Sequence, residues 1–554
     1  DRSRGLGVVY KRQGCGEKST IDISREAFDR IVEDAASLYV AMHPLRASRL
    51  GLEGADSLLF TFSPGEIEQA LATIDTLMDA LSALPADDLD DDRVDQSILI
   101  SDWMKGERFV FTQSRTCLDN PLLFCWMVEE ALMGLPARPW PAGDGERLAW
   151  VARINRIPVL LENTSAFLIK PGGIHLEETA RKLGSISGRI PMLARMAARR
   201  YGGPVPELET AGAAIERYRK TIDTLLESRI SSRQIMGLEE LSRILQYSEH
   251  LDFDSAKMIA EAEKITKRLS RQIAPPGVAV VDPGEVEITV SAGLADSLLS
   301  GIEDKLSSRR TFGMKKNPRS PVTGYEEVWI PLRLPVNPCL TLPVIPESTV
   351  RWAFGPEELR SCIPTVFVPA GKRYSVDRLL YDLLISSSLM SSPDRRACRD
   401  ESPVRRIFCS ETYRYAWKAH NSGDLTGLLP ERRMQLNRFH TTERVTALAR
   451  MILVFRLHSG QYTAEAAREY LGEITPLGPD AIETEVLRAS VSPVAAFEGI
   501  ATMTAESMVK KATVDRAGGK PRERVRKLLL DSTGMSPYLL MIRMPSRNIT
   551  CSVS

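Results

Sequence analysis

Apolar side chains recur with the 3.6-residue period of an α-helix along both flanks of this 554-residue chain. One such face near the N-terminus consists of Phe28, Ile31, Val32, Ala35, Leu38 and Tyr39. Ser63 and Glu66 predict the start of another helix, because this pair forms a capping box and Pro64 suits the first helical position. The periodicity therefore predicts a mainly α fold.

The same period predicts most of the remaining helices. They are expected at about 174–200, 207–228, 237–248, 252–273, 404–419, 441–458, 463–471, 480–489, 493–511 and 521–532. Pro158 lies inside a further helical pattern, where it removes a backbone donor and should kink or restart the helix. Gly460 follows the helix at 441–458 and suits its C-terminal cap.

The pattern changes in the middle of the chain, between about residues 276 and 374. Residues 286–290 alternate with period two, and 328–334 and 365–368 are short β-like runs. Prolines exclude a long central strand here, since proline cannot donate to a ladder; they stand at 331, 335, 338, 343 and 346. We expect a small irregular β-sheet with loops beside a central cleft.

The chain shows no internal repeat and no Gly/Ser-rich linker, so we expect one unit with two lobes. The N-terminal helical lobe is predicted at 20–275, the mixed loop and short-strand segment at 276–374, and the C-terminal helical lobe at 375–554. Residues 1–13 resemble the translated adapter sequence of metagenomic reads and lack an initiator Met. We therefore leave 1–19 out of the fold, and a signal peptide for export can be missing from this sequence.

Charge and cysteine content narrow the classes of function. The chain has 72 basic and 72 acidic residues, so no basic excess predicts nucleic-acid binding. No apolar run approaches the roughly 18 residues of a membrane span. The eight cysteines contain no Cys-x-x-Cys pair, which indicates reduced thiols and a cytoplasmic location by default. Nothing in the sequence indicates an oligomeric state.

The stretch from Ser375 to Trp417 is the centre of the C-terminal lobe. Ser375 is a suitable cap for an amphipathic helix over 375–390. Its apolar face consists of Val376, Leu379, Leu380, Leu383 and Leu384. An arginine-rich turn follows, and then a second helical segment around 405–417. We expect the two helices to pack side by side at the floor of a cleft.

In its surroundings this stretch resembles the metal-site region of the bacterial domain of unknown function 885 family. Members carry His-Glu-x-x-Pro-Gly-His on the helix and Glu-Gly-Trp-Ala-x-Tyr downstream, and their fold is similar to that of the carboxypeptidase Taq metallopeptidases. The resemblance runs from about residue 22 to 537. It implies a two-lobed, zincin-like fold with a zinc ion in a central cleft.

The metal motif is degenerate in this chain. When Trp417 is aligned with the family tryptophan, the first histidine ligand is replaced by Asp382 and the second by Ser388. Leu383 then stands in the position of the catalytic Glu, and Tyr415 in that of the Glu ligand. Another register leaves Glu411 as the surviving carboxylate, with serines at both histidine positions. Because a zinc hydrolase needs about three N/O ligands and a base, we predict a lost active site without a cofactor.

Family positions further along the chain also depart from the residues that catalysis would need. His458 matches a family histidine, and Arg488 belongs to a family segment beginning at Glu485. Phe497 stands where the family has a tyrosine and lacks the hydroxyl that would stabilise an oxyanion. The positions predicted to line the cleft are Asp382, Leu383, Ser388, Glu411, Tyr415, Trp417, His458, Arg488 and Phe497.

Other residue groups leave alternatives open. A replacement metal site could use His420, the His440–Glu443 pair at helical i, i+3 spacing, or Glu411. The arginines at 395, 396, 399, 405 and 406 could bind a carboxylate or phosphate, although they also suit a solvated turn. Residues 386–388 lack the elbow of a serine nucleophile, and 14–20 only partly match a phosphate-binding loop.

Together these features predict a catalytically degenerate relative of metallopeptidases. Its expected role is to bind a peptide or small molecule in a cleft, or to serve as a scaffold. The alternative is a working hydrolase, resembling carboxypeptidases, with a rebuilt metal site.

Overall fold

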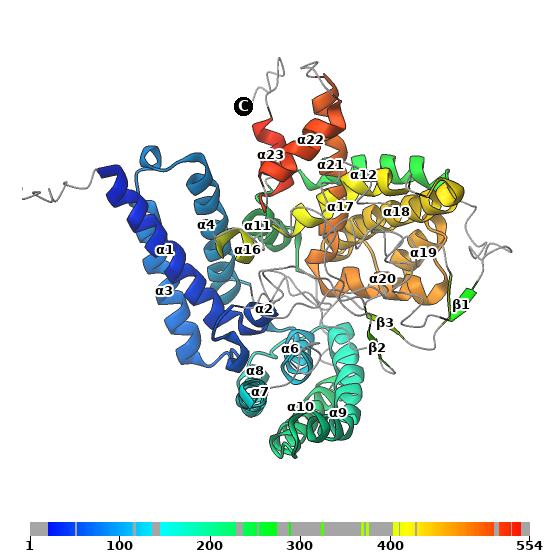
Figure 1. Cartoon of the computed structure of the whole chain (residues 1–554). Helices are drawn as coiled ribbons and strands as arrows, with labels where there is room; N and C mark the ends of the chain where they lie inside the picture. Colours follow the sequence, from blue (N-terminus) through cyan, green and yellow to red (C-terminus); the bar gives the residue numbers. More distant parts are fainter. Residues whose placement is uncertain are drawn as a thin grey trace, which may run out of the picture.

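The computed structural model describes most of both helical flanks and four short pieces of the middle segment (Figure 1). The described residues are 20–49, 52–114, 118–135, 144–228, 236–251, 254–273, 287–289, 323–325, 367–369, 373–375, 403–408, 410–426, 429–514, 520–532 and 534–544. Over this part the chain is mainly α-helical, which confirms the predicted fold class. None of its helices has the length and apolar character needed to cross a membrane.

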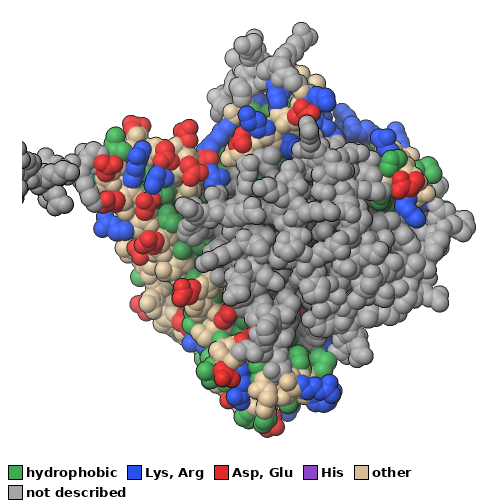
Figure 2. Space-filling model, viewed as in Figure 1, with side chains coloured by type: hydrophobic (Ala, Val, Ile, Leu, Met, Phe, Trp, Pro, Cys, Tyr) green, Lys and Arg blue, Asp and Glu red, His purple; other side chains and the backbone are tan. Residues whose placement is uncertain are grey.

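The first helices form a group at the left of Figure 1, where α1, α3 and α4 lie side by side. The elements are α1 (Thr20–Met42), α2 (Pro44–Arg49), η1 (Ala55–Ser57), α3 (Pro64–Ser82), η2 (Ala86–Asp88) and α4 (Asp91–Thr112). The capping box at the start of α3 is confirmed, since the Ser63 side chain accepts from the Glu66 backbone and Glu66 reaches back. Acidic and basic side chains are interspersed over this group (Figure 2).

The structure gives the bounds of seven further helices over the described residues of the N-terminal flank. They are α6 (Pro121–Met133), α7 (Asp144–Asn155), α8 (Ile157–Ser165), α9 (Gly173–Tyr201), α10 (Glu207–Glu227), α11 (Leu238–Glu249) and α12 (Ser255–Ser270). The break between α7 and α8 falls just before Pro158, so the predicted effect of this proline is confirmed. In α6 every side chain except that of Glu129 is buried, which places this helix inside the core.

The described residues of the middle segment form four strands of three residues each: β1 (Glu287–Thr289), β2 (Thr323–Tyr325), β3 (Phe367–Pro369) and β4 (Arg373–Ser375). β1 pairs antiparallel with β4, and β2 pairs parallel with β3. The described residues thus form two separate two-stranded pairs, and the single small sheet that we expected is not found there. Ser375, our expected helix cap, is the last residue of β4, and the helix predicted after it lies outside the described residues.

The C-terminal flank is again helical. Its elements are α16 (Pro403–Ile407), α17 (Glu411–Leu425), η7 (Pro430–Arg432), α18 (Arg433–His458), α19 (Ala464–Ile474), α20 (Pro479–Val491), η8 (Pro493–Ala496), α21 (Phe497–Val514), α22 (Pro521–Asp531) and α23 (Pro537–Arg543). Gly460 has a φ of 76°, as a C-terminal cap of α18 requires.

The helix expected at 404–419 is two helices, since α16 ends at Ile407 and Ser410 caps the start of α17. Its Oγ accepts a hydrogen bond from the Tyr413 backbone at 3.3 Å, so the backbone at Ser410 leaves the helical path before α17 begins. Likewise, the Ser492 Oγ accepts from the Val494 backbone, and a 3-10 turn precedes α21.

Two large clusters of buried apolar side chains form most of the core of the described residues, and both combine the two flanks. One joins α6–α12 to α18–α21, and the other joins α1, α3 and α4 to α16, α17 and α21–α23. α18 is central to the first cluster, because all its residues from Val445 to Phe455 are buried, including the polar residues Thr446 and Arg450. The N-terminal and C-terminal helices therefore bury their apolar faces against each other.

Candidate functional site

A small pocket lies where α17, α18 and α21 meet. Its volume is about 20 Å³, which is room for roughly one water molecule. The lining side chains come from all three helices: Tyr415, Lys418, Ala419, Ser422, His440, Glu443, Arg444, Ala447, Glu498 and Thr502. Most of them are polar, and the group includes Tyr415 and the His440–Glu443 pair singled out in the sequence.

A glycine lets α21 approach α18 closely at this point. A Cβ added at Gly499 would lie 2.6 Å from the Ala447 carbonyl oxygen and 2.6 Å from the Met451 Cβ. Such distances are far inside van der Waals contact, so only glycine fits the observed separation of the two helices. The neighbouring Glu498 is thereby brought against α18.

A buried carboxylate fixes the start of α17. Glu249, which is 1% exposed, accepts hydrogen bonds from the hydroxyl groups of Ser410 and Thr412 and from the Thr412 backbone at 3.3 Å. A negative charge is favourable here because the first backbone N–H groups of a helix carry a partial positive charge. Tyr413 adds a hydrogen bond from its hydroxyl to the Leu529 carbonyl at 2.6 Å, which joins α17 to α22.

Lys418 occupies the centre of the pocket wall. Its Nζ lies 2.8 Å from Glu498 Oε1 and 3.3 Å from Glu443 Oε2. Burial alone would lower the pKa of Lys418, but the carboxylates of Glu443 and Glu498 outweigh burial and raise it. Lys418 is therefore a fixed cation at neutral pH and does not serve as a nucleophile or a base.

The ion pairs continue behind the pocket. Arg450 donates from Nη1 to Glu498 at 2.9 Å and from Nε and Nη2 to Glu485, with the Nη2 bond at 2.8 Å. Arg488 donates from Nη1 to the same Glu485 carboxylate at 3.0 Å. The side chains of Arg450 and Glu485 are 6% and 0% exposed, so these charges are buried in the core.

The shared partners keep this network ionised. Burial favours the neutral form of Glu498, but Lys418 and Arg450 overcome that effect and hold its pKa well below the usual range. The pKa of Glu485 is also lowered, because Arg450 and Arg488 outweigh burial. The charges alternate along the series Arg488, Glu485, Arg450, Glu498, Lys418 and Glu443. We call this series the charge chain.

His440 lines the pocket in its neutral form. Burial is the main cause that lowers its pKa to about 4; Arg444 and Lys418 add to the effect, and Glu443 opposes it. Arg444 itself is ion-paired with Glu506. A neutral imidazole beside fixed charges can accept or donate one hydrogen bond to a ligand.

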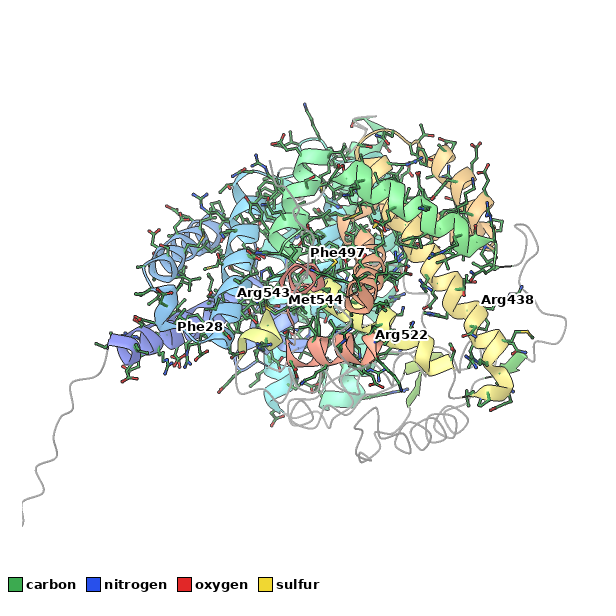
Figure 3. All side chains as sticks on the ribbon, turned by 90° about the horizontal axis from the view of Figure 1, so that it is seen from above. Phe28, Arg438, Phe497, Arg522, Arg543 and Met544 are labelled. Atoms are coloured by element: carbon green, nitrogen blue, oxygen red, sulfur yellow. The ribbon has the colours of Figure 1, made fainter. Side chains whose placement is uncertain are left out.

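The structure separates the predicted site residues into two groups. Tyr415 lines the pocket, and Arg488 is one end of the charge chain. Trp417, His458 and Phe497 are 3%, 4% and 1% exposed, and each is packed in the core. Figure 3 shows Phe497 among the helices, whereas Arg438 lies toward the outer end of α18.

His458 has a structural role at the end of α18. Its Nε2 hydrogen bonds to the Ala489 carbonyl at 3.1 Å, and burial lowers its pKa to about 4. Glu411 is the first residue of α17. Asp382, Leu383 and Ser388 lie outside the described residues, as do Ser386 and the arginines at 395, 396 and 399.

One arginine of the predicted turn is not solvated. Arg405 is 6% exposed and its guanidinium pairs with Asp92 of α4. The expectation of a solvated turn is therefore wrong for Arg405. This residue instead ties α16 to the N-terminal helices.

The replacement metal sites that we considered do not form among the described residues. No three His, Cys, Asp or Glu side chains converge there in an arrangement that could hold a metal. His420 is buried and its Nε2 hydrogen bonds to the Arg522 carbonyl at 3.0 Å. At the pocket, Lys418 already occupies the space between Glu443 and Glu498, so these side chains do not fit a zinc ion.

Sequence reasoning missed Lys418, Glu498 and Arg450. The sequence did contain a signal for Arg450 that we did not use, because it is a charged residue within the apolar run from Val445 to Phe455. A charge in such a run has to be paired when the helix is buried.

Comparisons with known proteins support the fold. No family model and no curated protein matches this chain, so the resemblance to the domain of unknown function 885 family stays a prediction. A solved structure from Colwellia psychrerythraea, described as a "putative lipoprotein", is similar with a TM-score of 0.71 and 13% identity. Another from Shewanella oneidensis, described as a "putative lipoprotein of unknown function", has a TM-score of 0.64 and 11% identity. Each match covers 94% of this chain and 98% of the other.

Proposed function

We propose that this protein is a non-catalytic binding protein, and that the pocket between α17, α18 and α21 receives one polar group of a peptide or small polar molecule. The observation that carries the proposal is the position of Lys418 between Glu443 and Glu498. An ammonium group there neutralises both carboxylates, which would otherwise be the natural ligands of a divalent cation. The pocket thus keeps polar groups for recognition without a metal-activated water.

The side chains at the pocket suit the binding of a ligand better than catalysis. Lys418 stays protonated and Glu498 stays ionised, so neither has the pKa of a group that exchanges protons near pH 7. His440 is neutral, because burial lowers its pKa, and it is the only histidine that lines the pocket among the described residues. The alternative, a hydrolase with a rebuilt metal site, would need ligands from elsewhere in the chain.

The experiment compares binding and cleavage in the same samples. A mixture of tri- and tetrapeptides is incubated with the protein, with and without Zn²⁺; calorimetry measures binding, and mass spectrometry measures cleavage. We expect binding without cleavage. Ala419→Phe should abolish binding by filling the pocket, whereas Ala72→Phe on the exposed face of α3 should leave it unchanged.

Two results would overturn the proposal. Zinc-dependent cleavage above the level of a heat-denatured control would favour the hydrolase. Equal binding by wild type and Ala419→Phe would place the ligand elsewhere.

We also propose that the protein acts outside the cytoplasm. This rests on the two similar structures, which are described as lipoproteins, and it replaces our default expectation from cysteine content. Cell fractionation and metabolic labelling with an alkyne fatty acid, applied to the complete gene product in a bacterial host, test it. Recovery of the unlabelled protein in the cytoplasmic fraction would refute it.

A further inference from the structure

The two arginines of the charge chain use their guanidinium groups differently. Arg450 donates from all three nitrogens: Nε and Nη2 to Glu485, and Nη1 to Glu498. Arg488 donates only from Nη1, to Glu485. Its Nε is buried and has no hydrogen-bond partner. Over the described part of the chain, the Nε–Nη2 edge of Arg488 is thus uncommitted.

This edge is the one that recognises carboxylates best. Nε–H and one Nη–H point in parallel, and they match the two oxygens of a carboxylate in a bidentate pair. Arg450 already forms such a pair with Glu485, so the protein contains an example of this geometry. Arg488 has the same edge, and no described residue supplies an anion to it.

The electrostatic surroundings leave Arg488 short of negative charge. It shares its single carboxylate partner, Glu485, with Arg450. Burial, and then the charge of Arg450, lower the pKa of Arg488, while Glu485 and Glu498 only partly oppose them. A buried guanidinium that is incompletely paired gains from a second anion.

Arg488 lies close to the pocket. Arg488 bonds to Glu485, and Arg450 bonds to both Glu485 and Glu498, which lines the pocket. The Arg488 side chain is 17% exposed, so part of it is open to solvent, while its Nε is buried. A ligand in the pocket can therefore direct an anionic group toward this arginine.

We propose that Arg488 binds a carboxylate group of the ligand through its Nε–Nη2 edge. The proposal rests on the proposed binding function and assigns the ligand class, a molecule with a free carboxylate. The carboxylate extends the charge chain by one anion beyond its cationic end. A peptide C-terminus and an acidic side chain both supply this chemistry.

The test uses three peptides of one length: Ala-Ala-Ala with a free C-terminus, its C-terminal amide, and N-acetyl-Ala-Glu-Ala-amide. Calorimetry measures their affinities for wild type, Arg488→Gln and Arg488→Lys. Arg468→Gln is the matched control, since Arg468 is an exposed arginine of α19 paired with Glu483 and Glu465. Circular dichroism checks that each variant is folded.

We expect at least one carboxylate peptide to bind about 10- to 100-fold more tightly than the amide, the range for a hydrogen-bonded charge pair. Arg488→Gln should remove this preference, Arg488→Lys should restore only part of it, and Arg468→Gln should preserve it. Preference for the free C-terminus or for the Glu side chain identifies the source of the carboxylate. Equal binding of all three peptides would overturn the carboxylate proposal while the binding function stands.

If no peptide binds, the proposed binding of peptides is overturned. A second measurement then tests the carboxylate site at Arg488 independently of peptide binding. Melting temperatures are then compared in sodium acetate and sodium chloride at equal ionic strength. Stabilisation by acetate over chloride that is lost in Arg488→Gln supports the carboxylate site. Equal melting temperatures in both salts would overturn it.

Discussion

Replacing Arg450 by Met tests whether the charge chain holds the C-terminal helices together. Methionine keeps much of the side-chain volume but removes every hydrogen bond to Glu485 and Glu498. Glu485, whose side chain is 0% exposed, would retain only the single bond from Arg488. Removing one partner of a buried ion pair costs about 3–5 kcal/mol, because the remaining charge is buried without compensation.

Urea denaturation followed by circular dichroism measures this loss. The control is Arg468→Met, which breaks an ion pair with Glu483 on the surface; such pairs contribute about 0–1 kcal/mol. A loss below about 1 kcal/mol for Arg450→Met, equal to the control, would refute the reasoning. The double variant Arg450→Met/Glu485→Gln should recover part of the stability, since it removes the unpaired charge.

The pH dependence of the same variant has a definite sign. In wild type the pKa values of Glu485 and Glu498 are lowered, so these groups stabilise the fold above pH 4.5 and lose that contribution as the pH falls below it. Without Arg450, burial raises the pKa of Glu485 instead. Acidification from pH 7 should then stabilise Arg450→Met relative to wild type.

Two further predictions concern packing and protonation. Gly499→Ala should destabilise the protein by about 1–3 kcal/mol in urea denaturation, because the new Cβ meets α18 at 2.6 Å. The control is Gly188→Ala in α9, where an added Cβ meets nothing within 4 Å. This variant should stabilise the protein by up to about 1 kcal/mol, because Ala favours a helix more than Gly does. His458 has a folded pKa of about 4 against 6.5 unfolded, so its contribution is complete above pH 6.5 and is lost toward pH 4. That difference corresponds to roughly 3 kcal/mol, and His458→Gln should flatten the decline in melting temperature over this window; an unchanged slope would contradict the assignment.

Local patterns predicted the long helices well. The helices expected at 174–200 and 207–228 are α9 (Gly173–Tyr201) and α10 (Glu207–Glu227), because their apolar period is strong and local. α18 begins at Arg433, eight residues before the predicted start. Its first turns have no apolar period, but Arg, Met, Gln and Leu are good helix formers.

Other boundaries depend on residues far away in the sequence. The break between α16 and α17 is fixed by Ser410, whose hydroxyl bonds to Glu249, 161 residues earlier. Glu249 is too far from Ser410 in the sequence to enter a local pattern. The apolar period alone therefore predicted one continuous helix. The three-residue strands of the middle segment pair across similarly long separations, as β1 does with β4.

The candidate site was predictable only in part for the same reason. Tyr415 and Arg488 were found through a motif, but Lys418 and Glu498 lie 80 residues apart and meet only because Gly499 lets α21 approach α18. Buried ion pairs are often no more stabilising than apolar side chains of similar volume. Stability alone therefore does not explain the charge chain, whereas the binding function that we propose does, because it requires Lys418 and Arg488 in fixed positions beside a polar pocket.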